Sequence, residues 1–220
     1  MKFVEYADRD LIMLGLADLL ASELAAALRQ NDGASFCVPG GTTPGPLFDI
    51  LSAVRIDWDR VTVFLGDERC VPETDERSNG RLLKSRLLCG RAAEARYLPL
   101  YTDAGTTVED VAAALAPHLP ISVLLLGMGA DMHTASLFPG ADNLAAALAA
   151  DAPPVMAMVQ PATGEARVSL TAPVLAGAMS IHILITGEEK RAAVEKAAHL
   201  DPIDAPIAAV LSGATVHWAP

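Results

Sequence analysis

Residues 121–133 read ISVLLLGMGADMH, an unbroken apolar run that ends in a glycine-rich turn carrying an acid and a histidine. An apolar run without alternation is typical of a strand that is buried on both faces, as in a parallel sheet covered by helices. Such sheets bind ligands beyond the carboxyl ends of their strands. This stretch therefore predicts a central parallel strand with a functional site directly after it.

The same arrangement, an apolar run followed by glycine and polar residues, occurs three more times. It is found in SFCVPGG at 35–41, VTVFLGDER at 61–69 and SIHILITGEEK at 180–190. Because the carboxyl ends of parallel strands share one edge of a sheet, we expect these turns to converge on one site.

Helical patterns separate these strands. Helices are expected at 10–30, from Pro44 onward, within 75–88, and at 107–116 and 188–198; further strands are expected at 155–159 and in the closing ATVHWA, and a surface helix or loop at 141–152. The alternation predicts an α/β fold, Rossmann-like, with a mainly parallel sheet and helices on both faces. No repeat or linker divides the chain, so we expect a single domain over residues 1–220.

The composition narrows the class of protein. Hydrophobic residues make up 52% of the 220, which excludes wholesale disorder. A net charge of -11 argues against nucleic acid or an anionic membrane as the main partner. The longest apolar stretch, taken as 121–130, is too short to span a bilayer. With no apolar signal segment in MKFVEYADRD and three cysteines in no paired spacing, we expect a cytoplasmic protein.

The segment VPGGTTPGP, residues 38–46, places glycines and hydroxyls between a strand and a helix. Glycine lets the backbone approach an anion, and the N–H groups of a helix start point toward it. An ordinary turn between strand and helix is the alternative. The spacing is not the dinucleotide-binding fingerprint.

The segment FLGDERCVPETDERSN, residues 64–79, carries charges directly after a buried strand. Asp67 could orient a group or accept a proton, and Arg69 and Arg77 could hold a phosphate or polarise a carbonyl. A structural network of ion pairs is the alternative.

The segment LLLGMGADMHTASLFPG, residues 124–140, presents Asp131 and His133 together. A neutral imidazole can remove a proton from water near pH 7, and a carboxylate can orient it. A purely structural histidine is the alternative. A metal site built from Asp67, Glu68, Asp131 and His133 has no supporting ligand spacing, and we expect no metal.

Two later segments each supply one well-placed cation, Arg167 in EARVSLTAPVL and Lys190 in ITGEEKRAAV. Lys190 falls in the first turn of its predicted helix, where the helix dipole disfavours a cation. A bound anion would offset that cost, whereas a solvated charge is the alternative for each residue alone.

Taken in order, the glycine turn, GDERCVP, SN, LGMGADMHTASLFPG, RVSLT and GEEK resemble the 6-phosphogluconolactonases over nearly the whole chain. These enzymes are similar in fold to glucosamine-6-phosphate deaminases and ribose-5-phosphate isomerases. The resemblance implies hydrolysis of 6-phospho-D-glucono-1,5-lactone in the oxidative pentose phosphate pathway, with no cofactor. The implied partner is a small sugar phosphate, with no nucleic acid or membrane. The sequence leaves the oligomeric state open between a monomer and a small homo-oligomer.

The resemblance also implies roles for individual residues. His133 would be the general base, with Asp67 and Arg69 at the reacting end of the substrate. The remaining implied contacts to the substrate are Gly40, Gly41, Thr42, Arg167 and Lys190 around the phosphate, Arg77 and Asn79 beside the sugar, and Asp131 next to the histidine.

The chain departs from the family pattern at three positions. Met132 stands where the family usually has glycine, so a left-handed backbone there would be strained. Pro39 replaces a common serine, and Cys70 replaces a common aromatic residue.

Two rival functions follow from the same fold. An amino-sugar phosphate deaminase or isomerase should carry an acid shortly after the histidine, but residues 134–138 read TASLF. A sugar-phosphate sensor without catalysis would have no need to retain His133, Asp67 and Arg69 together.

Overall fold

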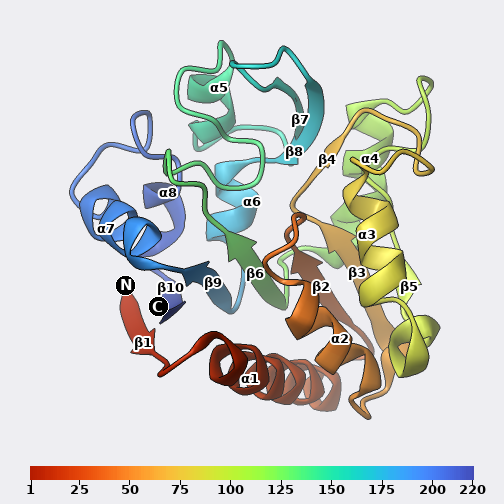
Figure 1. Cartoon of the computed structure of the whole chain (residues 1–220). Coiled ribbons are helices and arrows are strands. Elements are labelled where there is room, and N and C mark those ends of the chain that lie inside the picture. Colours follow the sequence, from red (N-terminus) through yellow and green to blue (C-terminus); the bar gives the residue numbers. More distant parts are fainter.

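The computed structural model describes residues 1–220, and its centre is a seven-stranded sheet in which every neighbouring pair is parallel (Figure 1). The strand order is β1-β10-β9-β6-β2-β3-β5. The strands are β1 (Lys2–Glu5), β2 (Ala34–Val38), β3 (Val61–Leu65), β5 (Arg96–Tyr97), β6 (Val123–Gly127), β9 (Ile181–Thr186) and β10 (Ala214–Ala219). The predicted α/β fold with a mainly parallel sheet is confirmed.

Helices cover both faces of this sheet, with α1 and α2 on one face and α4 and α6 on the other (Figure 1). Every residue of β2 and β3 is therefore buried, which explains why their sequences do not alternate. The helices are α1 (Arg9–Gln30), α2 (Gly45–Ala53), α3 (Asn79–Arg86), α4 (Val108–Leu115), α5 (Leu144–Leu148), α6 (Ala172–Ala176), α7 (Glu188–Ala197) and α8 (Ala208–Leu211), with short 3-10 turns at Trp58–Arg60, Gly90–Glu94 and Ala116–His118.

Helix α1 corrects one expectation about apolar segments. It has 22 residues and a mean hydropathy of 1.9 over its most apolar window, so by length and composition alone it could cross a membrane. The expectation that no apolar segment of the chain is long enough to span a bilayer was therefore wrong. In this structure Ile12, Leu16 and Leu20 are fully buried as part of the main core, and α1 packs beside β2, β6 and β10.

The order of the strands reverses between β2 and β6. From β2 the chain moves outward to β3 and β5, and then returns to β6 on the other side of β2. The turns that follow β2 and β6 therefore diverge, which opens a crevice between them at the carboxyl edge of the sheet. The predicted convergence of glycine turns falls at this crevice.

A second, antiparallel sheet of β4 (Asp67–Arg69), β8 (Ala166–Leu170) and β7 (Val155–Val159) stands beside the main one. We expected Asp67–Arg69 to be a turn after β3 and assigned no strand to 166–170. The chain changes sheets at Gly66, whose N–H donates to the Val38 carbonyl at 2.9 Å while its own carbonyl accepts from Leu170 N–H at 2.9 Å. This pairing depends on residues a hundred positions apart, so no local pattern indicates it.

A chain of polar side chains, with two buried histidines at its centre, ties α1 to strands β9 and β10 of the main sheet. The Tyr6 hydroxyl lies 3.0 Å from Nδ1 of His217, whose Nε2 lies 3.0 Å from Nδ1 of His182. His182 in turn contacts the Glu23 carboxylate at 2.8 Å. Burial, together with the neighbouring His182, lowers the pKa of His217 to about 4.

We predict that this histidine makes stability sensitive to mild acid. An unfolded histidine has a pKa of about 6.5, so between that value and about 4 the unfolded chain binds a proton that folded His217 does not. The resulting loss of folding free energy is about 2 kcal/mol between pH 7 and pH 5. Urea unfolding at both pH values should show a smaller loss for His217→Gln than for the wild type. The exposed His199→Gln variant is the control, and an equal loss in all three proteins would contradict the assignment.

Candidate active site

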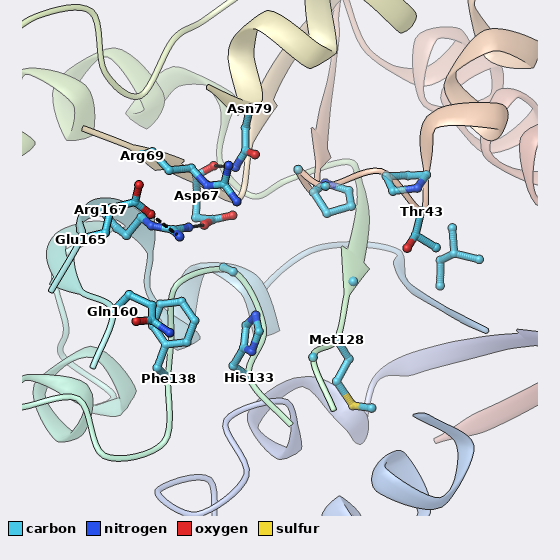
Figure 2. A pocket seen from close by; sticks show the side chains of 18 of the residues that line it. Thr43, Asp67, Arg69, Asn79, Met128, His133, Phe138, Gln160, Glu165 and Arg167 are labelled. Carbon is cyan, nitrogen blue, oxygen red and sulfur yellow. Dashed lines mark hydrogen bonds and ion pairs between the residues drawn. The ribbon is translucent and has the colours of Figure 1, made fainter. Parts of the chain in front are cut away.

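A cavity of about 410 Å³ lies at the crevice between β2 and β6. Its walls come from the turn after β2, the turn after β6, the start of α7 and the small antiparallel sheet (Figure 2). The turns after β2, β3, β6 and β9, which were predicted to converge on one site, therefore all contribute to this cavity. The side chains that define its chemistry are Thr43, Asp67, Arg69, Asn79, His133, Phe138, Gln160, Glu165, Arg167 and Lys190.

His133 lines the cavity and is held by Asp131, which lies behind it. Nδ1 of His133 is 2.5 Å from Oδ1 of Asp131, and the Phe138 ring packs against the imidazole at 4.7 Å between centroids. Because an ionised carboxylate can only accept, Nδ1 of the neutral ring carries the hydrogen and Nε2 carries the lone pair. The contact with Asp131 therefore leaves Nε2 as the ring nitrogen of His133 that can accept a proton.

The tight turn after β6 is what brings these two side chains together. A Cβ atom on Gly129 would lie 2.3 Å from the His133 ring and 2.4 Å from the Asp131 carboxylate, so any other residue would displace one of these two side chains. Met132 has φ 67°, in the left-handed region that disfavours a side chain. The strain expected at Met132 is thus present, and its carbonyl is held by the N–H of Ile207 at 3.1 Å.

The Asp67 carboxylate connects this turn to the small sheet. Oδ2 of Asp67 accepts the Ser136 hydroxyl at 2.6 Å and lies 3.4 Å from NH1 of Arg167. The Asp67 carbonyl accepts the Asn79 amide at 3.0 Å. With only 10% of its side chain exposed, Asp67 fixes three segments around the cavity.

Glu68 points away from the cavity and caps helix α3. Its carboxylate accepts the N–H groups of Asn79 at 2.8 Å, Gly80 at 2.6 Å and Arg69 at 2.7 Å, and the Ser78 hydroxyl at 3.1 Å. Burial raises the pKa of Glu68, while these hydrogen bonds favour the ionised form. Asp67, Glu68, Asp131 and His133 do not surround one point, and no three histidine, cysteine or acidic side chains are placed to hold a metal ion.

Three cations face the cavity against two carboxylates. Arg69 and Arg167 are directly opposed on β4 and β8, and the Nε of each is buried without a partner. Lys190 lies in the first turn of α7, where backbone N–H groups are also unpaired. Against Asp67 and Glu165, the lining carries a net positive charge in a protein of net charge -11. The cavity is therefore suited to a small anion.

Eight of the predicted site residues line the cavity, and three do not. The eight are Gly40, Gly41, Asp67, Arg69, Asn79, His133, Arg167 and Lys190. Asp131 does not line the cavity but contacts His133, which does. Thr42 is not among the lining residues, whereas its neighbour Thr43 is. Arg77 also lies outside it, since its guanidinium pairs with Asp75 and Glu165.

Sequence reasoning missed the β7–β8 turn, which contributes Gln160, Thr163 and Glu165 to the cavity. The segment 160–165 reads QPATGE and carries no apolar run or recognisable spacing. Only the antiparallel pairing of β7 with β8 carries it to the cavity. Phe138 lay within a recognised motif but was given no role.

A family model, curated proteins and solved structures all match this chain over nearly its whole length. Residues 7–218 match the family described as glucosamine-6-phosphate isomerases/6-phosphogluconolactonase. The chain is 41% identical to a 6-phosphogluconolactonase of Mesorhizobium japonicum, covering 98% of this chain and 94% of the relative. It is 40% identical to one of Pseudomonas aeruginosa, covering 94% and 90%. A crystal structure of a 6-phosphogluconolactonase from Shewanella baltica matches with a TM-score of 0.94 at 31% identity, covering 100% of this chain and 98% of that one.

We predict that Gly129→Ala separates His133 from Asp131. The added methyl group cannot coexist with either side chain, so the imidazole must rotate away. A crystal structure of the variant should show the Nδ1–Oδ1 contact broken and the rest of the fold unchanged. Gly127→Ala is the matched control, because its nearest neighbour is a Pro39 carbon at an ordinary 3.9 Å. An intact contact in Gly129→Ala would show that the glycine is not required.

Proposed function

Because the chain belongs to the glucosamine-6-phosphate isomerase/6-phosphogluconolactonase family, we propose that it hydrolyses 6-phospho-D-glucono-1,5-lactone to 6-phospho-D-gluconate. The observation that carries this proposal is the His133–Asp131 pair, which faces a cavity lined by cations. The names of the full-length relatives agree with it. The product belongs to the oxidative pentose phosphate pathway.

The phosphate of the substrate binds at the cationic part of the cavity. Arg167 and Lys190 supply charge, and the turn at Gly40 and Gly41 lets backbone N–H groups approach the oxygens. Gly40 is confined further by the Asn79 side chain, which a Cβ there would meet at 2.1 Å. Anchoring the phosphate leaves the lactone carbonyl to be placed near His133.

His133 acts as the general base. Its Nε2 takes a proton from water as the water oxygen attacks the lactone carbonyl carbon, and Asp131 stabilises the imidazolium that forms. The negative charge that develops on the carbonyl oxygen is met by Arg69 or by backbone N–H groups of the turn. The bond from the carbonyl carbon to the ring oxygen then breaks, and His133 returns the proton to that oxygen. No metal or organic cofactor takes part in this scheme.

A deaminase or isomerase is the rival activity within the same family. Enzymes of that kind should carry an acid a few residues after the catalytic histidine, for ring opening, and residues 134–138 supply only Thr134 and Ser136 as polar groups. Both hydroxyls are already committed, Thr134 to the Gly127 carbonyl at 3.0 Å and Ser136 to Asp67. The local chemistry therefore favours hydrolysis.

We predict that the purified protein accelerates hydrolysis of freshly generated 6-phosphoglucono-1,5-lactone above its spontaneous rate, equally with and without a chelator. Acid release at constant pH measures the reaction directly. The same preparation should release no ammonia from glucosamine 6-phosphate. Absence of lactone hydrolysis would overturn the proposed function; ammonia release would support the rival, and phosphate binding without turnover would support a sensor.

We predict that His133→Ala lowers kcat by about a hundredfold or more, as expected for loss of a general base. Lys190→Ala should instead raise KM with a smaller effect on kcat, because the lysine binds the part of the substrate that does not react. The exposed His199→Ala is the control for removing a histidine. Near-normal turnover by His133→Ala would contradict the mechanism while leaving the family unaffected.

A further inference from the structure

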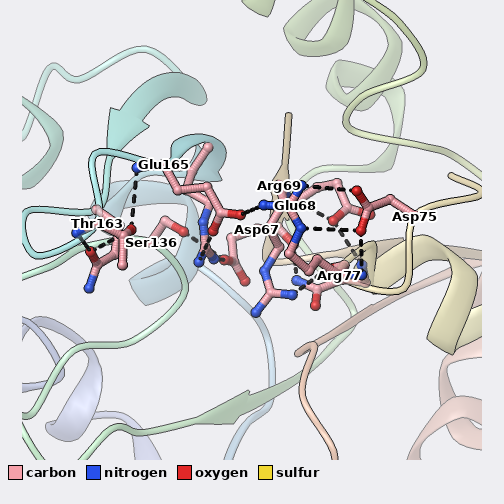
Figure 3. A network of polar contacts seen from close by, with 11 residues as sticks. Asp67, Glu68, Arg69, Asp75, Arg77, Ser136, Thr163 and Glu165 are labelled. Atoms are coloured by element: carbon pink, nitrogen blue, oxygen red, sulfur yellow. Dashed lines mark hydrogen bonds and ion pairs between the residues drawn. The ribbon is translucent and has the colours of Figure 1, made fainter. Parts of the chain in front are cut away.

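Arg77 is fixed outside the cavity between two carboxylates (Figure 3). Its NH2 lies 2.9 Å from Oδ2 of Asp75, its Nε donates to Oδ1 of Asp75 at 3.2 Å, and its NH1 lies 2.9 Å from Oε1 of Glu165. The side chain is 57% exposed, yet all three of its nitrogens are engaged. Arg77 is therefore oriented toward the β7–β8 turn.

The two carboxylate oxygens of Glu165 contact two different arginines. Oε1 accepts from Arg77, and Oε2 lies 2.6 Å from NH2 of Arg167. At its other end Arg167 meets Asp67, and only 11% of its side chain is exposed. The guanidinium of Arg167 is thus held at both ends, with its Nε buried and unpaired beside the cavity.

The carboxylates of Asp67 and Glu165 offset the repulsion between two neighbouring arginines. Arg69 and Arg167 are direct neighbours across β4 and β8, and like charges in that position repel. Asp67 offsets the repulsion from one side and Glu165 from the other. Without Glu165, Arg167 keeps the 3.4 Å contact with Asp67 and its place over the Phe138 ring at 5.9 Å, but loses its shortest ion pair beside a close cation, so we expect its guanidinium to leave the orientation seen here.

We propose that Glu165 and Arg77 are positioning residues for Arg167, and that Arg77 acts through Glu165 and does not touch the substrate. Arg77 holds Glu165, Glu165 holds Arg167, and Arg167 binds the anionic group. The nature of that group as a sugar phosphate rests on the proposed function. The positioning itself rests only on the contacts among these side chains.

The loss of the Glu165 charge and the loss of its contact with Arg167 should change the affinity for an anion in opposite directions. Removing a carboxylate from beside an anion site should, by Coulomb's law alone, tighten binding of the anion. Loss of the orientation of Arg167 should weaken it. The sign of the change in affinity after Glu165→Ala therefore distinguishes the two effects.

The chain offers a matched control for a general loosening of the 70–78 loop. Lys84 pairs with Glu73 of this same loop at 2.7 Å, tying it to α3, and neither residue lines the cavity. Lys84→Ala removes an exposed ion pair from the loop without touching Glu165. A loss of affinity caused only by loop mobility would appear in this variant as well.

The test compares four variants with the wild type: Arg77→Ala, Glu165→Ala, the double variant that combines these two, and Lys84→Ala. For each protein, KM and kcat are measured for the lactone, and the Kd of inorganic phosphate is measured by calorimetry. We expect Glu165→Ala to raise KM and Kd about tenfold, Arg77→Ala to raise them about threefold, and the double variant to match Glu165→Ala. We expect kcat to stay within about twofold of the wild type, Arg77→Lys to recover part of the loss, and Lys84→Ala to change nothing.

Three results would overturn the inference. The first is tighter binding of phosphate by Glu165→Ala than by the wild type. The second is an increase in KM and Kd on Arg77→Ala that is as large in the Glu165→Ala background as in the wild type. The third is an increase in KM and Kd on Lys84→Ala as large as that on Arg77→Ala. If the wild type fails to hydrolyse the lactone, the proposed function fails alone. The phosphate Kd values then still decide whether Arg77 and Glu165 position Arg167.

Discussion

The carboxylate of Asp67 lies at the junction of the segments that form the cavity, and the geometry of the site depends on it. It accepts the Ser136 hydroxyl from the turn after β6 and faces Arg167 on β8, while its own strand β4 continues directly from β3. A charge this deeply buried is stable only when it is paired and hydrogen-bonded. That requirement holds the base-bearing turn and the cationic strand pair in one fixed relation.

The division of the cavity into a base and a set of cations follows from this junction. On one side, Gly129 and the left-handed Met132 shape a turn tight enough for Asp131 to reach His133. On the other, β4 and β8 bring Arg69 and Arg167 together despite their like charges. The surrounding acidic protein repels anions in general, whereas the local excess of cations makes this one cavity attractive to them.

Features with a local signal could be predicted from the sequence, and those that depend on distant pairing could not. The predicted strands at 35–38 and 61–66 agree with the structure to within a few residues, because full burial leaves an apolar run without alternation. The predicted helix at 10–30 agrees as well, because its apolar residues recur at helical spacing. The antiparallel sheet was missed, since β4 has three residues and pairs with β8 about a hundred positions later. Without it, Gln160 and Glu165 had no reason to be assigned to the site, and Arg77 could not be separated from the residues that line the cavity.

We propose that His133 and Asp131 act together to activate water, and the decisive measurement is kcat for Asp131→Asn in the wild-type and His133→Ala backgrounds. In the otherwise wild-type enzyme we expect kcat to fall about tenfold or more, because the asparagine no longer stabilises the imidazolium. In the His133→Ala background we expect no further loss of kcat, because the effects of residues that act together are not additive. An equal loss in both backgrounds would show that Asp131 acts independently of His133.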